Sequence, residues 1–218
     1  MGNEKHFDYV FATPGSVLKS EYVESLLKTI KHLDAWGKTW TFLNKSSSFV
    51  PSAREMTATG TDGHDWTVTG ISDGAFTYGK VIWIDSDITW DIPAFERLVS
   101  WNYDIVSGVY AISEQRIAAT RWDSEGYATV LGPYEFIMED RPIQVDGVGF
   151  GFLAVKSGVF EAMKRPWFKI REGKVMGTDF PVNMGEDYSW CVGAKEAGFD
   201  IWLDPLCRVG HVKENILR

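Results

Sequence analysis

The sequence is short of cysteine, of positive charge and of long apolar runs, and each shortage excludes a class of protein. Its two cysteines, Cys191 and Cys207, have neither a zinc-site spacing nor a disulfide framework, which favours a reducing compartment. Lys and Arg number 22 against 30 Asp and Glu, and the net charge of −8 argues against a nucleic-acid-binding surface. No apolar run approaches membrane length, and residues 1–6 lack the apolar core of a signal peptide, so we expect a cytoplasmic protein without a membrane span.

Chain length and aromatic content, by contrast, are ample. A chain of 218 residues can bury a core of its own, and no repeat or Pro- or Ser-rich linker divides it, so we expect a single domain over residues 1–218. The 10 Trp and 13 Phe suit a large core or a cleft that stacks on rings or sugars.

Hydrophobic periodicity predicts an α/β fold with a mostly parallel central sheet flanked by helices. A strand at residues 9–12, a helix with Ser20 as its N-cap and Gly37 as its stop, and a strand at 39–43 form a βαβ opening. Strands at 117–122 and 127–131, joined by a turn, predict a small antiparallel portion. Residues 57–78 are rich in Thr, Gly and Asp and indicate a functional flap. Further strands are expected at 81–84, 104–110, 152–155 and 199–203, and further helices at 50–56, 93–101, 157–163 and 185–198.

Two carboxylates follow the strand at residues 81–84, whose unbroken apolar run indicates burial on both faces of a parallel sheet. Asp85 and Asp87 are two residues apart, so in an extended chain both side chains point the same way. Like charges this close repel unless they share a proton or a cation, and a hard divalent metal is favourable at neutral pH. The alternative is a loop whose acids cap the helix that follows.

A second acidic cluster begins a helix. Asp187 shares one helical face with Trp190, Cys191 and Ala194, which places its carboxylate on the inward-facing side of the first turn. Such a carboxylate beside a cleft suits a general base. Acids at a helix N-terminus are also stabilising by about 0.3–1 kcal/mol without any further role, and both interpretations stay open.

His211 follows the last strand and a glycine. A lone histidine usually packs or lies on the surface, but here the two acids lack a ligand that is not a carboxylate, and imidazole suits Mn²⁺ and similar ions. We therefore predict His211 as a third metal ligand.

In combination, these residues resemble a glycosyltransferase of the GT-A fold, specifically its small family-2-like members. Residues 85–87 resemble the D-x-D metal motif, residues 185–187 the x-E-D motif, and residues 210–211 the C-terminal metal histidine. The glycine-rich stretch 147–151, residues 166–168 and residues 52–54 also resemble the family, and the likeness extends over residues 8–213. Glu55 departs from the pattern, because the family often has Asn there.

The resemblance implies an enzyme that moves a sugar from a nucleotide-diphosphate sugar, of UDP or GDP type, to a hydroxyl of a glycan or other acceptor. Mn²⁺ or Mg²⁺ would be the cofactor and would stabilise the diphosphate leaving group. By this resemblance Asp87 and His211 would bind the metal, and Asp85 would contact the ribose or the metal. Thr13 and Pro14 would bind the nucleotide with Arg54 nearby, and the backbone at Gly149 would approach the donor sugar.

The resemblance also implies roles at the acceptor. Asp187 would deprotonate the acceptor if the enzyme inverts, and Glu186 would orient the acceptor or the donor sugar. Trp90, Trp167 and Phe168 would stack on a sugar ring, with core packing an equal alternative for the two tryptophans.

Two rival functions remain. A haloacid-dehalogenase-like phosphatase also has a D-x-D-x-T motif, here residues 85–89, but that motif normally opens its domain, and such an enzyme would not use His211. A non-catalytic nucleotide-sugar-binding module would bind the donor without turnover, although such a module has no use for a complete metal set.

Overall fold

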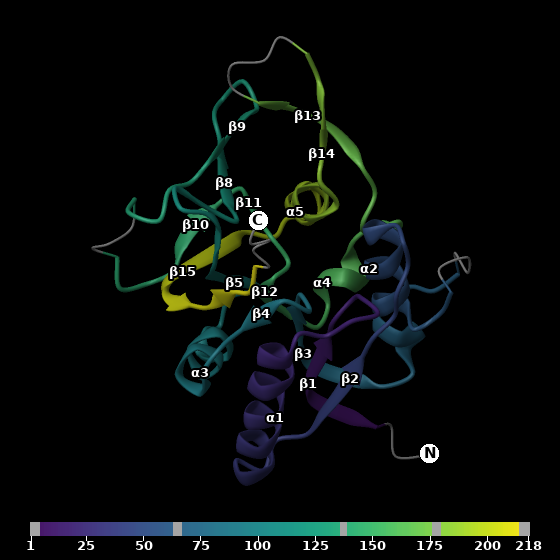
Figure 1. The fold of residues 1–218 in the computed structure, drawn as a ribbon. Helices are drawn as coiled ribbons and strands as arrows, with labels where there is room; N and C mark the ends of the chain where they lie inside the picture. The colour runs from purple at the N-terminus through teal and green to yellow at the C-terminus, as the bar shows by residue number, and fades with distance from the viewer. Residues whose placement is uncertain (1–4, 63–66, 136–138, 176–179, 214–218) are drawn as a thin grey trace, which may run out of the picture.

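A computed structural model of the chain describes residues 5–62, 67–135, 139–175 and 180–213, and within them the chain forms a three-layer α/β structure (Figure 1). A central sheet separates two layers of helices. In spatial order the strands of this sheet in the described residues are β10 (Ile143–Val145), β15 (Ile201–Arg208), β5 (Ile105–Val109), β12 (Phe152–Lys156), β3 (Thr77–Ile84), β1 (His6–Ala12) and β2 (Trp40–Leu43).

Most strands of the central sheet run in one direction. Strand β1 pairs in parallel with both β2 and β3, and β15 pairs in parallel with β5. Strand β12 lies between β3 and β5 and is antiparallel to both, so β3 and β5 share a direction, while β10 is antiparallel to β15 at the edge. The mostly parallel sheet and the βαβ opening predicted from the sequence are therefore confirmed.

Both faces of the sheet are covered by helices. The described helices on one face are α1 (Ser20–Ala35) and α3 (Ile92–Ser100), and those on the other are α2 (Val50–Thr59), α4 (Val159–Ala162) and α5 (Glu186–Glu196). Strand β3 contributes to both cores, because Val81 and Trp83 pack on the α2 side and Ile82 and Ile84 on the α1 side. Complete burial of each such side chain contributes roughly 1.5–3 kcal/mol to folding.

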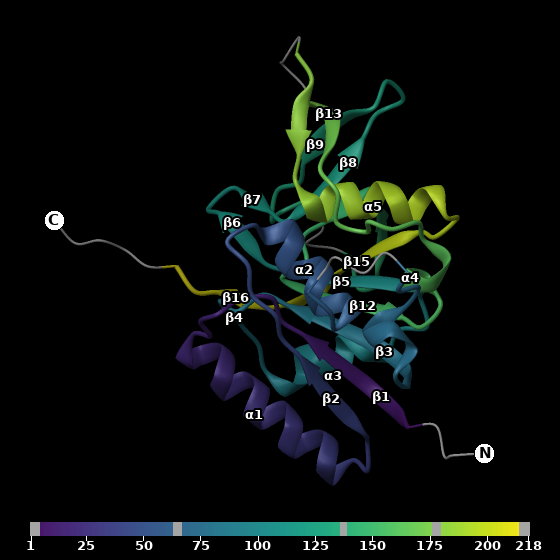
Figure 2. The same cartoon turned by 90° about the vertical axis from the view of Figure 1, so that its right-hand side faces the viewer.

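A smaller sheet projects above α5 (Figure 2). In spatial order its described strands are β11 (Gly147–Val148), β8 (Ala119–Trp122), β9 (Tyr127–Val130), β13 (Arg171–Val175) and β14 (Val182–Met184). Strands β8 and β9 form the predicted hairpin, whose turn is closed by hydrogen bonds from the Glu125 and Tyr127 amides to Asp123. Short pairs are formed by β4 (Ile88–Thr89) with β16 (Gly210–His211) and by β6 (Ala111–Ser113) with β7 (Arg116–Ile117).

The flap predicted at residues 57–78 is wrong for its described part. Helix α2 continues to Thr59, a 3₁₀ turn spans Ile71–Gly74, and residues 63–66 lie outside the described chain. Val68 and Ile71 are each 1% exposed, so this segment packs against the core. The Tyr78 hydroxyl, which donates to Glu161, further fixes it.

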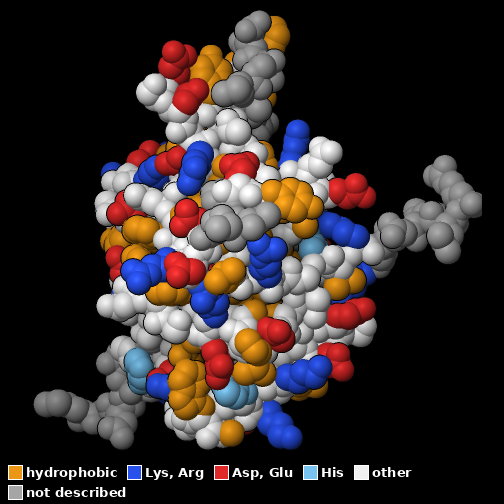
Figure 3. Space-filling model, turned by 90° about the vertical axis from the view of Figure 1, so that its left-hand side faces the viewer, with side chains coloured by type: hydrophobic (Ala, Val, Ile, Leu, Met, Phe, Trp, Pro, Cys, Tyr) orange, Lys and Arg blue, Asp and Glu red, His pale blue; other side chains and the backbone are white. Residues whose placement is uncertain are grey.

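Two boundaries also differ from the sequence prediction. Helix α1 begins at Ser20, but its N-cap is Lys19, and the Ser20 hydroxyl donates to Glu21 instead of capping the helix. Strand β15 continues past Leu203 to Arg208, with an irregular register between them. Among the described helices, none combines the length and apolar character needed to cross a bilayer. On the face drawn in Figure 3, the visible acidic and basic side chains are intermixed and form no continuous patch of one sign.

Candidate active site

The candidate active site lies at the edge of the sheet where β1 and β3 end. Ala12, the last residue of β1, lies opposite Trp83 of β3, so the turns that follow these two parallel strands are neighbours. The first turns of α2 lie beside them, and together these segments enclose a pocket of about 290 Å³. The pocket is lined by Pro14, Gly15, Ser47, Val50, Ala53, Arg54, Asp85, Ser86, Asp87 and His211.

A backbone pairing brings His211 to the predicted metal motif. Strand β16 is antiparallel to β4, with His211 opposite Ile88, and the Val212 amide donates to the Asp87 carbonyl at 2.8 Å. As a result, His211 Nε2 lies 3.1 Å from Asp87 Oδ2, although the two residues are 124 positions apart in the chain. Asp87 and His211 therefore meet as the sequence analysis requires.

The other nitrogen of the imidazole fixes its tautomer. His211 Nδ1 lies 2.9 Å from the Ala111 carbonyl oxygen, and because a carbonyl only accepts, Nδ1 carries the hydrogen. In a neutral ring the Nε2 lone pair then faces the Asp87 carboxylate, which is a repulsive contact between two acceptors. A proton on Nε2 or a cation between the two groups removes this repulsion. A ring whose far N–H is held by a carbonyl is also the arrangement usual for metal-binding histidines.

Asp85 points to Arg54 rather than to the histidine. Arg54 is buried, and its guanidinium lies 3.1 Å from Asp85 Oδ1 and 3.0 Å from Glu186 Oε1. Burial opposes the charge of Arg54, but the carboxylates of Asp85, Asp187 and Glu186 outweigh that cost and raise its pKa above the ordinary value. Arg54 thus links the turn after β3 to the start of α5. Its Nη1 is buried and has no hydrogen-bond partner among the described residues.

Asp187 is half-buried in the first turn of α5. Loss of hydration raises the pKa of its carboxyl to about 6; Arg54 acts in the opposite direction, while Glu186 and Asp85 add to the rise. Its Oδ1 accepts a hydrogen bond from the Tyr188 amide at 2.8 Å. A carboxylate with a pKa near 6 is ionised at neutral pH and is basic enough to share a proton with a hydroxyl.

The turn after β1 is held by Tyr22 and Asn44, two residues to which the sequence analysis gave no role at the site. Thr13 is fully buried, with its hydroxyl 2.5 Å from that of Tyr22, so this side chain is not available to a nucleotide. Asn44 donates through Nδ2 to the carbonyls of Thr13 and Gly15, while Pro14 lines the pocket. Asn44 could have been found as a polar residue directly after a parallel strand, where ligand sites gather.

The glycines predicted to approach the donor sugar pack against Tyr110. A Cβ atom at Gly149 would overlap the Tyr110 hydroxyl, and one at Gly151 would lie 2.5 Å from Tyr110 Cζ. The Gly151 amide donates to the Tyr110 hydroxyl at 3.0 Å. Close contact with the tyrosine therefore accounts for both glycines, and the sugar-binding role of Gly149 stays a prediction.

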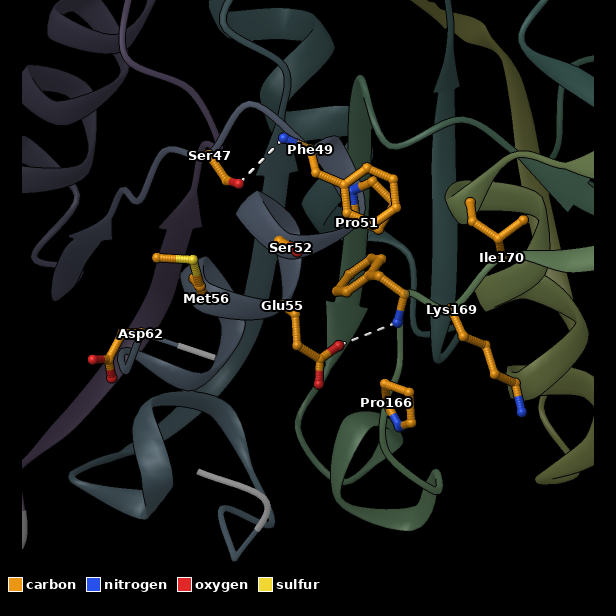
Figure 4. Close-up of a pocket in the computed structure, with 11 residues that line it drawn as sticks. Ser47, Phe49, Pro51, Ser52, Glu55, Met56, Asp62, Pro166, Lys169 and Ile170 are labelled. Atoms are coloured by element: carbon orange, nitrogen blue, oxygen red, sulfur yellow. Dashed lines mark hydrogen bonds between the residues drawn. The ribbon is translucent and has the colours of Figure 1, made fainter. Parts of the chain in front are cut away.

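Glu55 points away from the candidate active site. It is buried and accepts from Arg165 Nε at 2.7 Å and from the amides of Trp167 and Phe168 at 3.0 and 3.2 Å. It borders a separate pocket of about 420 Å³ on the other flank of α2 (Figure 4). Glu55 thus ties α2 to the segment after α4 and leaves Arg54 to face the acids.

The three aromatic residues considered for sugar stacking belong to the core. Trp90, Trp167 and Phe168 are 6%, 2% and 2% exposed, and Trp90 Nε1 donates to Thr29. For the two tryptophans the core alternative is confirmed. The stacking role predicted for Phe168 is wrong, because its ring is enclosed by Trp83, Phe150 and Phe160.

The described residues do not include a ready-made metal cluster. Nowhere in this part of the chain are three or more His, Cys, Asp or Glu side chains arranged to hold an ion. The structure joins two of the three predicted ligands, Asp87 and His211, and pairs the third, Asp85, with Arg54. Metal binding by these residues stays a prediction.

Comparison with known proteins identifies no relative by sequence, since no family model and no curated protein matches the chain. The crystal structure of A197 from STIV aligns with 98% of this chain and 97% of its own at 18% identity, but the TM-score of 0.48 is too low to establish a common fold. The crystal structure of GalNAc-T7 with UDP, GalNAc and Mn²⁺ aligns with a TM-score of 0.57 and 12% identity, covering 97% of this chain and 44% of that one. This similarity supports a glycosyltransferase-like α/β fold for the chain.

Proposed function

We propose that this protein is a metal-dependent glycosyltransferase of the GT-A fold, which moves a sugar from a nucleotide-diphosphate sugar to an acceptor hydroxyl. The observation that carries the proposal is the contact between Asp87 and His211, which lies just beyond the end of β3 and in which the imidazole tautomer is fixed. Similarity in fold to a protein that binds UDP, GalNAc and Mn²⁺ adds support.

The residues present fit a divalent cation whose remaining coordination positions are filled by the substrate. Asp87 and His211 would hold Mn²⁺ or Mg²⁺, which relieves the acceptor–acceptor contact between them. Two protein ligands are enough when phosphate oxygens supply the rest, as is usual where such ions bind with nucleotides. When bound, the ion supplies Lewis-acid stabilisation of the diphosphate leaving group.

Arg54 adds a second, permanent positive charge beside this pocket. Its guanidinium is held in place by Asp85 and Glu186, and Nη1, which has no hydrogen-bond partner within the described chain, offers one more donor. A donor fixed before substrate arrives stabilises developing negative charge without reorganisation. In this proposal Arg54 contacts the diphosphate of the donor. Asp85 holds the Arg54 guanidinium in place and also contacts the ribose or the ion.

Asp187 is the proposed general base. Its pKa of about 6 leaves it ionised above that pH, so it can take the proton of the acceptor hydroxyl as the bond to the sugar forms. This role applies to an inverting reaction. Glu186, which is anchored by Arg54, would orient the acceptor or the donor sugar. The phosphatase alternative would need Asp85 as a free nucleophile, whereas Arg54 already pairs with this carboxylate.

A thermal-shift assay with UDP, GDP and their sugars, with and without Mn²⁺, tests the proposal. A ligand at about 100 times its Kd stabilises the folded state by about 2.7 kcal/mol, or roughly 5–11 °C in a chain of this size. We expect a nucleotide shift that needs Mn²⁺ and is mostly lost in Asp87→Ala and His211→Ala. His6→Ala, at the opposite end of β1, is the matched control and should keep the shift.

Absence of a Mn²⁺-dependent shift with any nucleotide would contradict the assignment. Turnover is measured separately, as Mn²⁺-dependent hydrolysis of the nucleotide sugar that gives the largest shift. Binding without any hydrolysis or transfer, unaffected by Asp187→Asn, would favour the non-catalytic binding module.

A further inference from the structure

A groove with mostly apolar walls lies beside α5, under the smaller sheet. It has a volume of about 230 Å³ and is formed by residues of β8, β9, β13 and β14 together with the start of α5. These elements project together above α5 in both ribbon views (Figures 1 and 2). The apolar and aromatic walls come from Trp122, Ala128, Val130, Val182, Met184 and Tyr188.

The groove adjoins the proposed general base. Gly185, the N-cap of α5, forms part of its wall, and the position of a Cβ atom on Gly185 is 2.9 Å from Asp187 Oδ1. Tyr188, the residue after Asp187, forms another part of the wall. The groove and the carboxylate that would deprotonate the acceptor are therefore neighbours across Gly185, although Asp187 itself does not line the groove.

The aromatic walls are held in place before any ligand binds. The Trp122 amide donates to Asp146 Oδ2 at 2.8 Å, and Lys195, which pairs with Asp146, places its Nζ 5.2 Å from the centre of the Trp122 indole ring system. On the other side, the Tyr188 ring packs against Gly147, where a Cβ atom would lie 2.8 Å from it. Preorganised walls of this kind reduce the ordering cost of binding.

We propose that this groove receives the apolar part of the acceptor, so that the acceptor class is a hydroxyl compound carrying an alkyl or aryl group. The inference rests on the proposed transferase function, because that function gives the neighbouring Asp187 its role. A sugar seated here would leave most of its hydroxyls facing apolar walls without hydrogen-bond partners, which is unfavourable.

Matched acceptors of different apolar size test this inference. Methyl, phenyl and octyl glycosides of the same sugars, kept below micelle-forming concentrations, are titrated into the protein with the nucleotide and Mn²⁺ that give the thermal shift, and also without them. Each buried methylene strengthens binding by about fourfold, so we expect the octyl or phenyl glycoside to bind at least about tenfold more tightly than the methyl glycoside. A larger gain with octyl indicates an alkyl acceptor, and a larger gain with phenyl indicates an aryl one.

Substitutions in the groove provide the second arm. Met184→Gln and Val130→Thr keep the size of half-buried side chains while adding polarity, and we expect each to reduce the preference for octyl or phenyl to below about threefold. Ile170→Gln, on an apolar residue that is 42% exposed outside the groove, is the matched control and should retain the preference. An unchanged nucleotide–Mn²⁺ shift in all three variants shows that they fold.

Equal binding of the methyl, phenyl and octyl glycosides, or a preference for phenyl or octyl that survives both groove substitutions, would overturn the inference while leaving the transferase assignment intact. The converse is also distinguishable. If no nucleotide gives a Mn²⁺-dependent shift but the octyl preference appears and is lost in the groove variants, the apolar ligand site stands and the transferase assignment fails.

Discussion

Replacing Asp187 with Asn should make the protein more stable at neutral pH while removing its proposed activity. The carboxylate is half-buried at the start of α5, and loss of hydration raises its pKa from 3.8 to about 6 in spite of the opposing charge of Arg54. An amide at this position keeps an oxygen for the Tyr188 amide but carries no charge to desolvate. The functional group and the source of instability are thus the same carboxylate.

The size and sign of the effect follow from proton linkage. The protonated carboxyl stabilises the folded state, so this contribution is fully present below pH 3.8 and is lost as the pH rises through about 6. A rise of roughly two pKa units corresponds to about 3 kcal/mol at pH 7.5 and about 1 kcal/mol at pH 4.5. Asp187→Asn should recover at most these amounts, or up to about 6–12 °C in melting temperature at pH 7.5.

Chemical denaturation of both proteins at pH 4.5 and 7.5 measures the gain directly. The matched control is Glu186→Gln, one residue earlier in the same helix, which removes an ion-pair partner of Arg54 and should destabilise the protein at pH 7.5. Sugar transfer by the unsubstituted protein should rise with pH through about 6 and be lost in Asp187→Asn. A gain that is absent at pH 7.5, or equal at the two pH values, would refute the reasoning.

Three further predictions concern buried contacts around the site. Arg54→Met leaves the facing carboxylates without their cation, and urea denaturation at pH 7.5 should show a loss of about 3–5 kcal/mol; a loss below 1 kcal/mol would contradict a buried ion-pair role. Glu55→Gln weakens the bond to Arg165, so the melting temperature should fall by several degrees, corresponding to roughly 2 kcal/mol, with Mn²⁺-dependent nucleotide binding unchanged. Gly149→Ala should destabilise the fold by about 1–3 kcal/mol through overlap with the Tyr110 hydroxyl, and the double variant with Tyr110→Phe should recover part of that loss in the same denaturation assay.

Secondary structure near the site was predictable wherever the local sequence pattern is compatible with only one type of element. The apolar run of β3 indicated a strand covered on both faces, and its side chains do divide between the two cores. The βαβ opening and the hairpin of β8 and β9 were likewise readable from periodicity and turn residues. In contrast, strands β13 and β14 were missed, because their short, polar sequences form a hairpin only by pairing with each other and with β9.

Burial was the property that local pattern predicted least well. The composition of residues 57–78 indicates a loop, yet Val68 and Ile71 are held against the core by contacts with segments far along the chain. The stacking role predicted for Phe168 was wrong for the same reason, since nothing in its local sequence indicates the rings that enclose it.

The end of strand β15 also depended on tertiary pairing. This strand continues through Pro205 because pairing with β5 resumes at Arg208 beyond an irregular stretch.

The sequence by itself determined which groups are available at the site: two acids after a buried strand, an acid in the first turn of a helix, an arginine in a short helix and a histidine near the end of the described chain. Only the tertiary structure decided how they are paired. Pairing of β4 with β16 brings His211 into contact with Asp87. The position of α2 lets Arg54 form ion pairs with Asp85 and Glu186. These contacts join residues 31 to 132 positions apart, and their geometry depends on the packing of whole elements, which no local pattern encodes.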